Sequence, residues 1–531
     1  MIRIIITLLA VLAYLTIGNV SAQSAPAGTS SFASRGDQDK SSFPSLESDS
    51  PSMQFNLTHS SVEKRSVKED TWLALQRHLN HGRARLASMK NKGAPSAEEL
   101  SEAMDRRRRW LERRDKYDQF NTVDKLGRAM TLDNHPLEAS TVNQTERSVP
   151  PTERPRGSRR SSGKFVARDN SDVSRIKQAA VHNKVTKAQD PTSPHTIGLD
   201  IEANDVGYFA TVQIGSSNNK FKMLIDSGSS DTWVAGSDCS SCSTQNKLGT
   251  DSSKSLKISD KKYKISYGTG SVLVHRAHDD MTVAGMTVKN MQFGVSTHET
   301  PEFGGKDIPF DGLIGLSGSS LSVLGSKTVI DMMAEQNLVQ QPVVGYRLGR
   351  VADGSNNNHG QITFGAIDSS QVSGSIAEFD NQSNDGYWEV SLDDVSVGSK
   401  SVIGSRRRRG GNVHRATLDT GTSLIIAPKS QADAIHNAIH GASSDGQGGY
   451  EIPCSTDATL TFTFSGGHKF TVNSRDLIFA GSNKNSGMCI SAVSSGATQG
   501  DSAWLLGAAF LKNVYFATNT KSNQIGLGKL K

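Results

Sequence analysis

Two short stretches of the chain place an aspartate in a glycine turn directly behind an apolar run. Leu224–Val234 reads LIDSGSSDTWV, and Thr417–Ile426 reads TLDTGTSLII. In each stretch the apolar residues predict a buried strand, and the Asp-Ser/Thr-Gly sequence predicts a tight turn with the carboxylate at its tip. Asp226 and Asp419 are therefore the first candidates for chemistry.

Two carboxylates that face each other within hydrogen-bonding distance cannot both ionise, so the pair keeps one proton and titrates as a unit. The ionised member can take a proton from a water molecule held between the two. The protonated member can polarise a peptide carbonyl. Attack by the water then gives a tetrahedral diol, and a proton passes to the leaving nitrogen. Peptide hydrolysis of this kind needs no covalent intermediate, no metal and no cofactor.

Each turn carries the same three kinds of neighbour. A glycine two residues after the aspartate lets backbone N–H groups approach the carboxylate. A hydroxyl directly after the aspartate can brace one turn against the other, and a hydroxyl three residues after it can bond the outer carboxylate oxygen. In that order, these neighbours are Gly228 and Gly421, Ser227 and Thr420, and Ser229 and Thr422.

The elements that must position the aspartates also occur twice. An apolar run ending in or containing glycine follows each turn, FDGLIGL at Phe310–Leu316 and AWLLG at Ala503–Gly507. Repetition of this kind predicts two homologous lobes related by a pseudo-twofold axis. The two aspartates would then meet at the boundary between the lobes.

The chain from about Ile197 onward has an all-β pattern, in which short apolar and β-branched runs alternate with Gly, Ser, Asn and Asp turns. Helical periodicity is scarce there, and Lys327–Glu335 and Ser430–Ile439 are the best cases. The segment is too long for one ordinary β core, which again favours two lobes. The expected strands include Tyr208–Ile214, Phe221–Ile225, Tyr263–Tyr267, Met281–Val288, Gln361–Phe364 and Thr459–Phe464.

The N-terminus predicts entry into the secretory pathway. The apolar run Ile4–Ile17 follows Arg3 and leads to the small residues Val20–Ala22, as in a signal peptide at residues 1–22. We expect a protein that is secreted outside the cell or delivered to a vacuole or lysosome. The end of the chain has no hydrophobic tail, so no membrane anchor is expected.

The four cysteines fit this oxidising route. Pairing of neighbours along the chain would give two local disulfides, Cys239–Cys242 and Cys454–Cys489. The CxxC spacing of the first pair could instead indicate redox chemistry or a zinc site, although no second CxxC or His pair has the spacing for zinc. No metal site is therefore expected.

Charge divides the chain into a basic leader and a slightly acidic body. The formal net charge of +6 combines about +9 in residues 1–197 with about −3 in residues 198–531. A basic excess confined to a segment behind a signal peptide does not predict a nucleic-acid partner. It predicts a propeptide, and the leader contains basic pairs at which a processing protease could cut or which could simply be solvated. These pairs are Lys64-Arg65, Arg106–Arg109, Arg113-Arg114 and Arg159-Arg160.

Parts of the leader predict helices, whereas residues 23–60, rich in Ser, Pro and Gly, predict disorder. Thr71 could cap a first helix whose apolar face carries Trp72, Leu75, Leu79 and Leu86. The sequence Ser96–Glu99 has the form of a capping box that opens a second helix. The apolar residues of that second helix are Leu100, Met104 and Leu111.

Six motifs, in order, make the body resemble the pepsin-type aspartic endopeptidases of family A1, from about Asp200 to Leu530. They are DSGSSDTW at 226–233, YGTGS at 267–271, FDGLIGL at 310–316, GYW at 386–388, LDTGTS at 418–423 and WLLG at 504–507. The resemblance implies a secreted acid endopeptidase, made as a zymogen of the fungal type, with Asp226 and Asp419 as its catalytic residues.

The resemblance also implies a bilobal fold with a substrate cleft and a β-hairpin flap at Tyr263–Ser271. The hydroxyl of Tyr267 would reach toward the Trp233 indole, and the flap glycines would allow opening. The implied organisation is a signal peptide at 1–22, a propeptide at 23–197, an N-terminal lobe at 198–370 and a C-terminal lobe at 371–531. The residues implied around a bound peptide are Tyr267, Gly268, Thr269, Gly228, Gly421 and Thr422.

Several expectations depend on this interpretation. The propeptide would inhibit the enzyme through ion pairs between its bases and the cleft, and acid would release it, but the sequence does not say which base covers the aspartates. The enzyme would be a monomer that cuts peptides. Arg406–Arg409 would form an exposed loop that is nicked, lines a basic subsite or is simply solvated. Possible glycosylation sites are Asn56, Asn143 and Asn381.

An alternative of another class is an inactive binding or inhibitor protein with the same fold. Loss of one aspartate or of the flap tyrosine would be its signature. Asp226, Asp419 and Tyr267 are all present, which favours the enzyme.

Overall fold

The computed structural model describes residues 70–90, 95–123, 170–182, 184–243, 246–268, 270–306, 308–354, 356–403, 413–482, 487–496 and 502–531. All of them belong to one compact unit, Val67–Lys531. The expected features that lie outside the described residues are the signal peptide, the disorder of residues 23–60, Lys64-Arg65, Arg159-Arg160, Asn56, Asn143, Thr269 and Arg406–Arg409.

The first half of the body forms a nine-stranded sheet, and β5 ends in this sheet at Asp226. β5 runs parallel to β10, with Gly315 opposite Asp226. In sheet order the strands are β1 (Val185–Thr186), β3 (Asp200–Glu202), β4 (Gly207–Ile214), β5 (Asn219–Asp226), β10 (Gly312–Gly315), β6 (Trp233–Ala235), β9 (Met286–Glu299), β8 (Ser271–Val283) and β7 (Lys257–Ser266).

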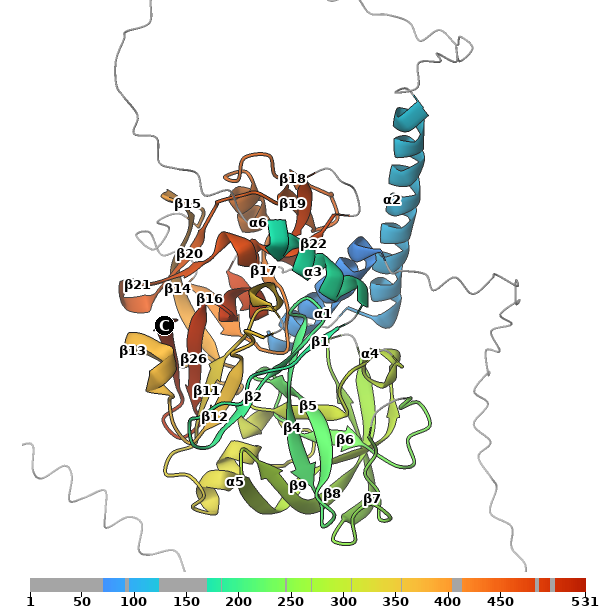
Figure 1. Cartoon of the computed structure of the whole chain (residues 1–531), viewed down its shortest axis with the longest axis vertical. Coiled ribbons are helices and arrows are strands. Elements are labelled where there is room, and N and C mark those ends of the chain that lie inside the picture. Colours follow the sequence, from blue (N-terminus) through green and yellow to red (C-terminus); the bar gives the residue numbers. More distant parts are fainter. Residues whose placement is uncertain are drawn as a thin grey trace, which may run out of the picture. The chain divides into compact units, whose positions relative to one another are not determined.

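The second half repeats this arrangement in an eight-stranded sheet, where β16 runs parallel to β25 and leads directly into Asp419. The strands in order are β21 (His468–Val472), β20 (Leu460–Phe464), β14 (Glu389–Val397), β16 (His414–Leu418), β25 (Ala503–Leu506), β17 (Ile425–Pro428) and β24 (Val493–Gly496), with β15 (Lys400–Ser401) beside β14. Figure 1 shows the green strands of the first sheet and the orange and red strands of the second as separate groups. The prediction of an all-β fold with two lobes is confirmed.

The glycines after the two apolar runs are explained by close packing. A Cβ on Gly315 would lie 2.4 Å from the carbonyl carbon of Ser230, and one on Gly507 would lie 2.2 Å from the carbonyl oxygen of Thr422. Real Cβ atoms do not approach backbone so closely. Each glycine therefore lets its strand pack directly against the turn that holds an aspartate.

Two further sheets complete the body. A four-stranded sheet contains β18 (Ser443–Ser444), β19 (Tyr450–Pro453), β23 (Met488–Ser491) and β22 (Ile478–Gly481). A six-stranded sheet takes strands from both halves of the chain, in the order β13 (Val372–Asp380), β27 (Gln524–Leu530), β26 (Val514–Asn519), β11 (Val343–Arg347), β12 (Gln361–Phe364) and β2 (Thr196–Gly198). The expected boundary between residues 197 and 198 lies inside β2, which pairs with β12.

Helices are few in the body. The leader contributes α1 (Thr71–Met89), α2 (Ala97–Val123) and α3 (Asn170–His182), and the body contributes α4 (Pro301–Gly304), α5 (Val329–Glu335), α6 (Lys429–His436) and α7 (Ala508–Leu511). Short 3₁₀ segments are η2 (Ser319–Leu321), η3 (Val351–Asp353), η4 (Ser369–Gln371), η6 (Ser465–Gly467) and η7 (Ser474–Leu477). Among the described residues, no helix is long and apolar enough to cross a membrane.

Helix α1 is packed into the body. Its residues Trp72, Leu75, Leu79 and Leu86 are buried and belong to the same apolar cluster as residues of both sheets. The capping box of the second helix is confirmed, because Ser96 and Glu99 exchange backbone-to-side-chain hydrogen bonds of 2.7 and 3.1 Å. The leader and the body thus share one hydrophobic core.

Two local predictions were wrong. The N-cap of α1 is Asp70, whose carboxylate accepts from the Trp72 N–H, so Thr71 is the first helical residue. The run Met281–Val288 is a hairpin and not one strand. Ala284 and Gly285 adopt positive φ angles of 51° and 78°, which suit the two-residue turns that join antiparallel strands.

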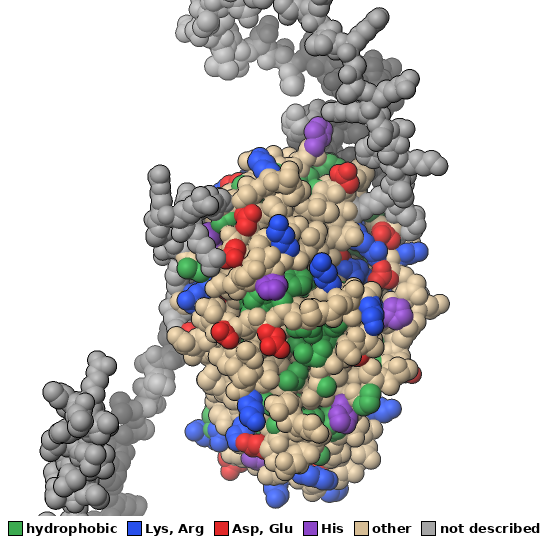
Figure 2. All heavy atoms as spheres, turned by 90° about the vertical axis from the view of Figure 1, so that its left-hand side faces the viewer, with side chains coloured by type: hydrophobic (Ala, Val, Ile, Leu, Met, Phe, Trp, Pro, Cys, Tyr) green, Lys and Arg blue, Asp and Glu red, His purple; other side chains and the backbone are tan. Residues whose placement is uncertain are grey.

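Surface charge has no single dominant sign in the view that the figures give. On the face that Figure 2 shows, Lys and Arg side chains are scattered among Asp and Glu side chains, with apolar side chains between them. Some of the basic residues of the leader form buried ion pairs with the body.

Candidate active site

The two aspartates lie together at the meeting of the two sheets, and both are buried. Asp226 is 1% exposed and Asp419 is 0% exposed. Each glycine of one turn faces the carboxylate of the other turn. A Cβ on Gly228 would lie 2.6 Å from Asp419 Oδ1, and one on Gly421 would lie 2.4 Å from Asp226 Oδ1. Glycine is therefore required at both positions by the approach of the opposite carboxylate.

Reciprocal hydrogen bonds join the two turns. The Ser227 N–H donates to Thr420 Oγ1 at 2.9 Å, and the Thr420 N–H donates to Ser227 Oγ at 3.0 Å. Each hydroxyl then donates onward into the opposite strand, to Leu418 O at 3.3 Å and to Ile225 O at 2.8 Å. This network fixes the two aspartates relative to each other.

Each carboxylate also accepts two hydrogen bonds from its own turn. Asp226 Oδ1 accepts from the Gly228 N–H at 3.0 Å, and its Oδ2 accepts from the Ser229 hydroxyl at 2.5 Å. In the second turn, Asp419 Oδ1 accepts from the Gly421 N–H at 2.9 Å, and its Oδ2 accepts from the Thr422 hydroxyl at 2.6 Å. The structure brings together every residue that the sequence placed in these two turns.

A leader residue occupies the space between the carboxylates. Arg85, near the end of α1, is 6% exposed and forms ion pairs with both aspartates. Its Nη2 donates to Asp226 Oδ1 and, at 3.0 Å, to Asp419 Oδ1, while its Nε lies 2.5 Å from Asp419 Oδ2. The planar guanidinium thus spans both acids, a geometry for which arginine is suited.

This arrangement separates the titration of the two acids. Burial opposes ionisation of both carboxyls, and the charge of Arg85 favours it. At Asp226, Arg85 and the hydrogen bonds from Ser229 and Gly228 prevail, and the pKa is lowered. At Asp419, burial and the neighbouring charge of Asp226 prevail, and the pKa is raised. Burial disfavours the charge of Arg85 as well, yet the two aspartates more than offset this and raise its pKa.

The sequence did not identify Arg85. It is one of several leader bases, and from the sequence alone an arginine side chain in a helix is usually expected to be solvated. Its position carried a usable signal, because it follows the buried Gly82 by three residues and precedes the buried Met89 by four. A base at that spacing lies on the packed face of the helix.

Other leader bases also bind the body, and three of them belong to α1, α2 and the residue that caps α1. The Lys90 amino group pairs with Glu389. Arg83 donates to the carbonyl oxygens of Gln447 and Ser495, both at 3.3 Å. Arg107 is fully buried, its guanidinium lies over the rings of Trp72 and Trp110, and it pairs with Asp445 at 2.6 Å. Part of the basic stretch Arg106–Arg109 is therefore inaccessible to a processing protease while α2 is folded.

The flap forms the β7–β8 hairpin, which contacts both the body and the leader. The Trp233 indole N–H donates to Tyr267 Oη at 2.7 Å, as expected, and both rings pack on Phe303 with centroid distances of 5.6 and 5.0 Å. A Cβ on Gly268 would lie 2.4 Å from the carbonyl oxygen of His81 in α1. The flap is thus closed over the leader helix.

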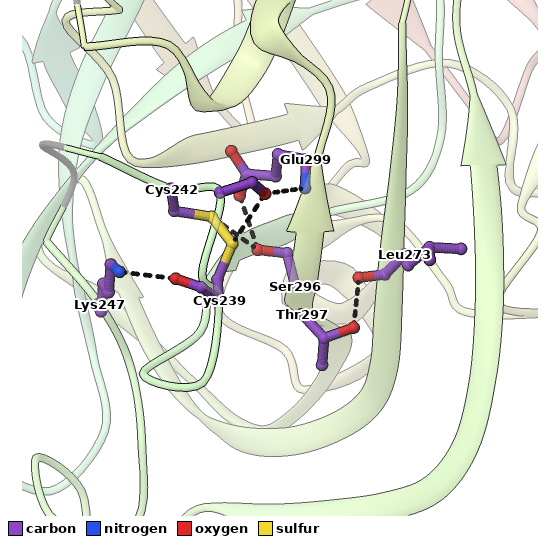
Figure 3. Close-up of a disulfide and its surroundings, with 8 residues drawn as sticks. Cys239, Cys242, Lys247, Leu273, Ser296, Thr297 and Glu299 are labelled. Atoms are coloured by element: carbon purple, nitrogen blue, oxygen red, sulfur yellow. Dashed lines mark hydrogen bonds between the residues drawn. A yellow bond between two sulfur atoms is a disulfide. The ribbon is translucent and has the colours of Figure 1, made fainter. Parts of the chain in front are cut away.

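Cys239 and Cys242 are joined in a disulfide, as are Cys454 and Cys489, with Cα–Cα distances of 5.5 and 5.0 Å. Figure 3 shows the first bridge beside Ser296 and Glu299. Both sulfurs of this bridge are buried and bonded to each other. This favours a stabilising disulfide over redox chemistry or a zinc site at the CxxC sequence. Burial raises the pKa of Glu299 to about 7.

Asn381 is the one expected glycosylation site among the described residues. Its Nδ2 donates to Asn523 Oδ1 at 2.9 Å, and its Oδ1 accepts from the N–H groups of Ser383 and Glu389 at 3.2 and 2.9 Å. The amide therefore organises the start of β14, where it is only half exposed.

Comparison with known proteins agrees with this site. Residues 207–530 match the family model described as eukaryotic aspartyl protease. A probable aspartic-type endopeptidase CTSD of Trichophyton verrucosum is 36% identical over 347 residues, 65% of this chain and 65% of that protein. The aspartic-type endopeptidase ctsD of Aspergillus fumigatus is 33% identical over 65% of this chain and 70% of its own length. Rhizopuspepsin of Rhizopus chinensis is 33% identical over 61% of this chain and 78% of its own length. The match thus spans about two thirds of the first two of these relatives.

The reciprocal bracing can be tested by replacing Thr420. Thr420→Val removes the hydroxyl and leaves the buried Ser227 N–H without its acceptor, which should lower the free energy of unfolding by about 1–3 kcal/mol. Thr420→Ser keeps the hydroxyl and should behave nearly as the original chain. Chemical denaturation of the full chain measures both, and equal stability of the Val and Ser variants would contradict the role given to the hydroxyl.

Proposed function

Because the chain belongs to the eukaryotic aspartyl protease family, we propose that it is an aspartic-type endopeptidase made as an inactive precursor. The observation that carries the proposal is the pair of buried aspartates held face to face with a leader arginine between them. An inactive binding protein with the same fold would have no need for a symmetric pair of acids, four hydrogen-bond donors to them and a cation that covers them.

In the proposed reaction, removal of the leader lets a water molecule take the place of the Arg85 guanidinium. One carboxyl is ionised and takes a proton from the water as its oxygen attacks the peptide carbonyl. The other carboxyl donates its proton to the carbonyl oxygen. The diol then collapses, the C–N bond breaks, and the leaving nitrogen takes a proton. Gly228, Gly421 and Thr422 hold the carboxylates in place for these transfers.

The flap supplies the other side of the proposed peptide site. Tyr267, in the turn between β7 and β8, is held by Trp233, so this end of the hairpin is anchored. Gly268 allows the backbone of the hairpin to approach a bound chain as it now approaches α1. Thr269 at the tip, which lies outside the described residues, completes the proposed contacts with substrate.

The leader, residues 23–197, is the proposed intramolecular inhibitor. A cut between residues 197 and 198 would divide β2, which pairs with β12. We therefore propose that the cut falls shortly before this boundary, so that Thr196 and Ile197 stay with the N-terminal lobe. A signal peptide at residues 1–22, secretion or vacuolar delivery, and a monomeric mature enzyme with lobes at 198–370 and 371–531 complete the proposal.

The proposal is tested by acid digestion of a denatured protein with the purified product. The Asp226→Asn variant should lose all activity above background. An amide at this position cannot share a proton with the Asp419 carboxyl, and it cannot act as a base toward the water. Asp380→Asn changes an exposed aspartate of β13 and should retain full activity. Inhibition by pepstatin is expected for the active forms. Cleavage by Asp226→Asn at the original rate would overturn the proposal in favour of the inactive binding protein.

Replacing the leader arginine should release the site. Arg85→Gln removes the cation that compensates two buried acids, so docking of α1 weakens and the full chain should cleave a fluorogenic peptide at a higher pH than the unchanged precursor does. Arg109→Gln, at an exposed position of α2, serves as the control. If the Arg85→Gln precursor needed the same acidity for activity, Arg85 would not be the group that blocks the dyad.

Two leader histidines should set the pH of activation. Burial, and next the charges of Arg77 and Arg85 respectively, lower the pKa of His78 to about 4 and that of His81 to about 3. In a released helix, both histidines would have pKa values near the ordinary 6.5, so they would bind protons at a pH at which the docked helix does not. Docking is therefore fully stable above pH 6.5 and weakens as the pH falls toward 4 and 3.

The variants His78→Gln and His81→Gln should accordingly stay docked to lower pH, shifting the midpoint of processing downward by about 0.5–1 pH unit. His440→Gln, on the exposed end of the segment after α6, should leave the midpoint unchanged. The midpoint is read from gels of precursor incubated across pH 3–7. An unchanged or raised midpoint in both variants would contradict the histidine contribution and leave the carboxyls as the groups that respond to acid.

A further inference from the structure

Glu389 is a buried carboxylate whose close cationic partner belongs to the leader and not to the body. It opens β14, is 3% exposed, and pairs with the Lys90 amino group at the end of α1. Within the described part of the body, its carboxylate contacts the Thr417 hydroxyl at 3.1 Å and lies 3.7 Å from Arg415 Nη1. Removal of the leader therefore deprives Glu389 of its nearest positive charge.

The position of Glu389 places it beside the dyad. It is directly opposite Thr417 in the β14–β16 pair, and Thr417 precedes Asp419 by two residues. Opposed residues of an antiparallel pair project to the same face of the sheet. Along the leader, Lys90 follows Arg85 by five residues, which is about 7–8 Å of helix. An extended peptide covers that length in about two residues.

The ion pair between Arg415 and Glu389 is too weak to compensate the buried charge of Glu389. Arg415 is 47% exposed, it also donates to the Gln382 carbonyl oxygen at 3.0 Å, and its distance from Glu389 is long for an ion pair. An exposed pair of this kind contributes little. A buried carboxylate that loses a close partner is costly unless another cation replaces it.

Comparison with Asp445, another body acid bound by a leader base, supports the same distinction. Asp445 Oδ1 accepts the N–H groups of Gln447 and Gly449 at 2.6 and 3.0 Å, so this carboxylate also shapes its own loop after the leader has gone. The carboxylate of Glu389 accepts no backbone N–H among the described residues. Its geometry suits a side chain that arrives from outside the body.

We propose that Glu389 forms a substrate subsite that selects a lysine or arginine side chain within about two residues of the scissile bond, and that Lys90 occupies this subsite in the precursor. The inference rests on the proposed function and adds a class of substrate to it, namely peptides with a basic residue near the cut. The leader then blocks the cleft at two points, with Arg85 at the acids and Lys90 at the subsite.

The test uses the activated enzyme and peptides of one sequence that carry lysine, norleucine or glutamate in turn at each of three positions on either side of the scissile bond. At one position within two residues of the cut, the enzyme should favour lysine over norleucine by about tenfold in kcat/KM. Glu389→Gln should reduce this ratio to about one. Glu378→Gln, an exposed glutamate of β13, should leave the ratio unchanged.

The outcomes separate the two proposals. Cleavage of the norleucine peptides without any preference for lysine, or a preference that survives in Glu389→Gln, overturns the subsite and leaves the endopeptidase intact. Failure to cut any peptide overturns the proposed function, and with it the subsite. Loss of the preference in Glu389→Gln alone supports the subsite.

A measurement that needs no activity examines the same contact in the precursor. In a double-mutant cycle, Lys90→Met should lower the thermal midpoint of the full chain when Glu389 is present, and should have a smaller effect in the Glu389→Gln background. Additive effects of the two substitutions would show that Lys90 and Glu389 do not interact, and would overturn the proposal that the leader fills the subsite.

Discussion

Two carboxylates buried side by side are the constraint on which this molecule depends. Such a pair is stable only if a proton or a cation compensates the second charge, and only if hydrogen bonds satisfy the remaining oxygens. The turns around Asp226 and Asp419 supply the hydrogen bonds, and in the precursor Arg85 supplies the cation. In the proposed mature enzyme, a shared proton and a water molecule take over the same task. The proposed inhibition and the proposed catalysis are thus two ways to compensate the same buried charges.

The leader satisfies this constraint because it is part of the fold. Its apolar residues, such as Leu75 and Leu79, are as deeply buried as those of the sheets, and its bases form ion pairs with buried acids of the body. The cost of this arrangement is sensitivity to acid. His78 and His81 must stay neutral while the helix is docked, so the stability of docking falls as the pH drops below their ordinary pKa.

Much of this was predictable from the sequence, because turn chemistry and duplication are local signals. The Asp-Ser/Thr-Gly turns, their bracing hydroxyls and the Tyr267–Trp233 contact were all expected, and the structure places them together. The duplicated all-β fold was predictable for the same reason. The hairpin within Met281–Val288 was not, since Ala284 carries no turn signal and the apolar residues on both sides read as one strand.

The contacts between the leader and the body could not be predicted. Spacing along α1 can place Arg85 on the packed face of the helix, but it does not show that Arg85 reaches the aspartates. Nor does it distinguish Lys90 from a solvated lysine until the helix is placed against the body. The boundary at residue 197 follows a change of composition and falls within β2, which pairs with β12 in the six-stranded sheet. Composition describes a segment by itself, whereas strand pairing depends on the partner strand.

The exchange of hydrogen bonds between Ser227 and Thr420 has a mechanical consequence. Since each turn holds the other through its main chain, the floor of the cleft behaves as a pivot. Any tilt of the two halves about this point would leave the separation of the acids unchanged. In the proposed enzyme, a peptide could then enter without disturbing the alignment of the reacting groups.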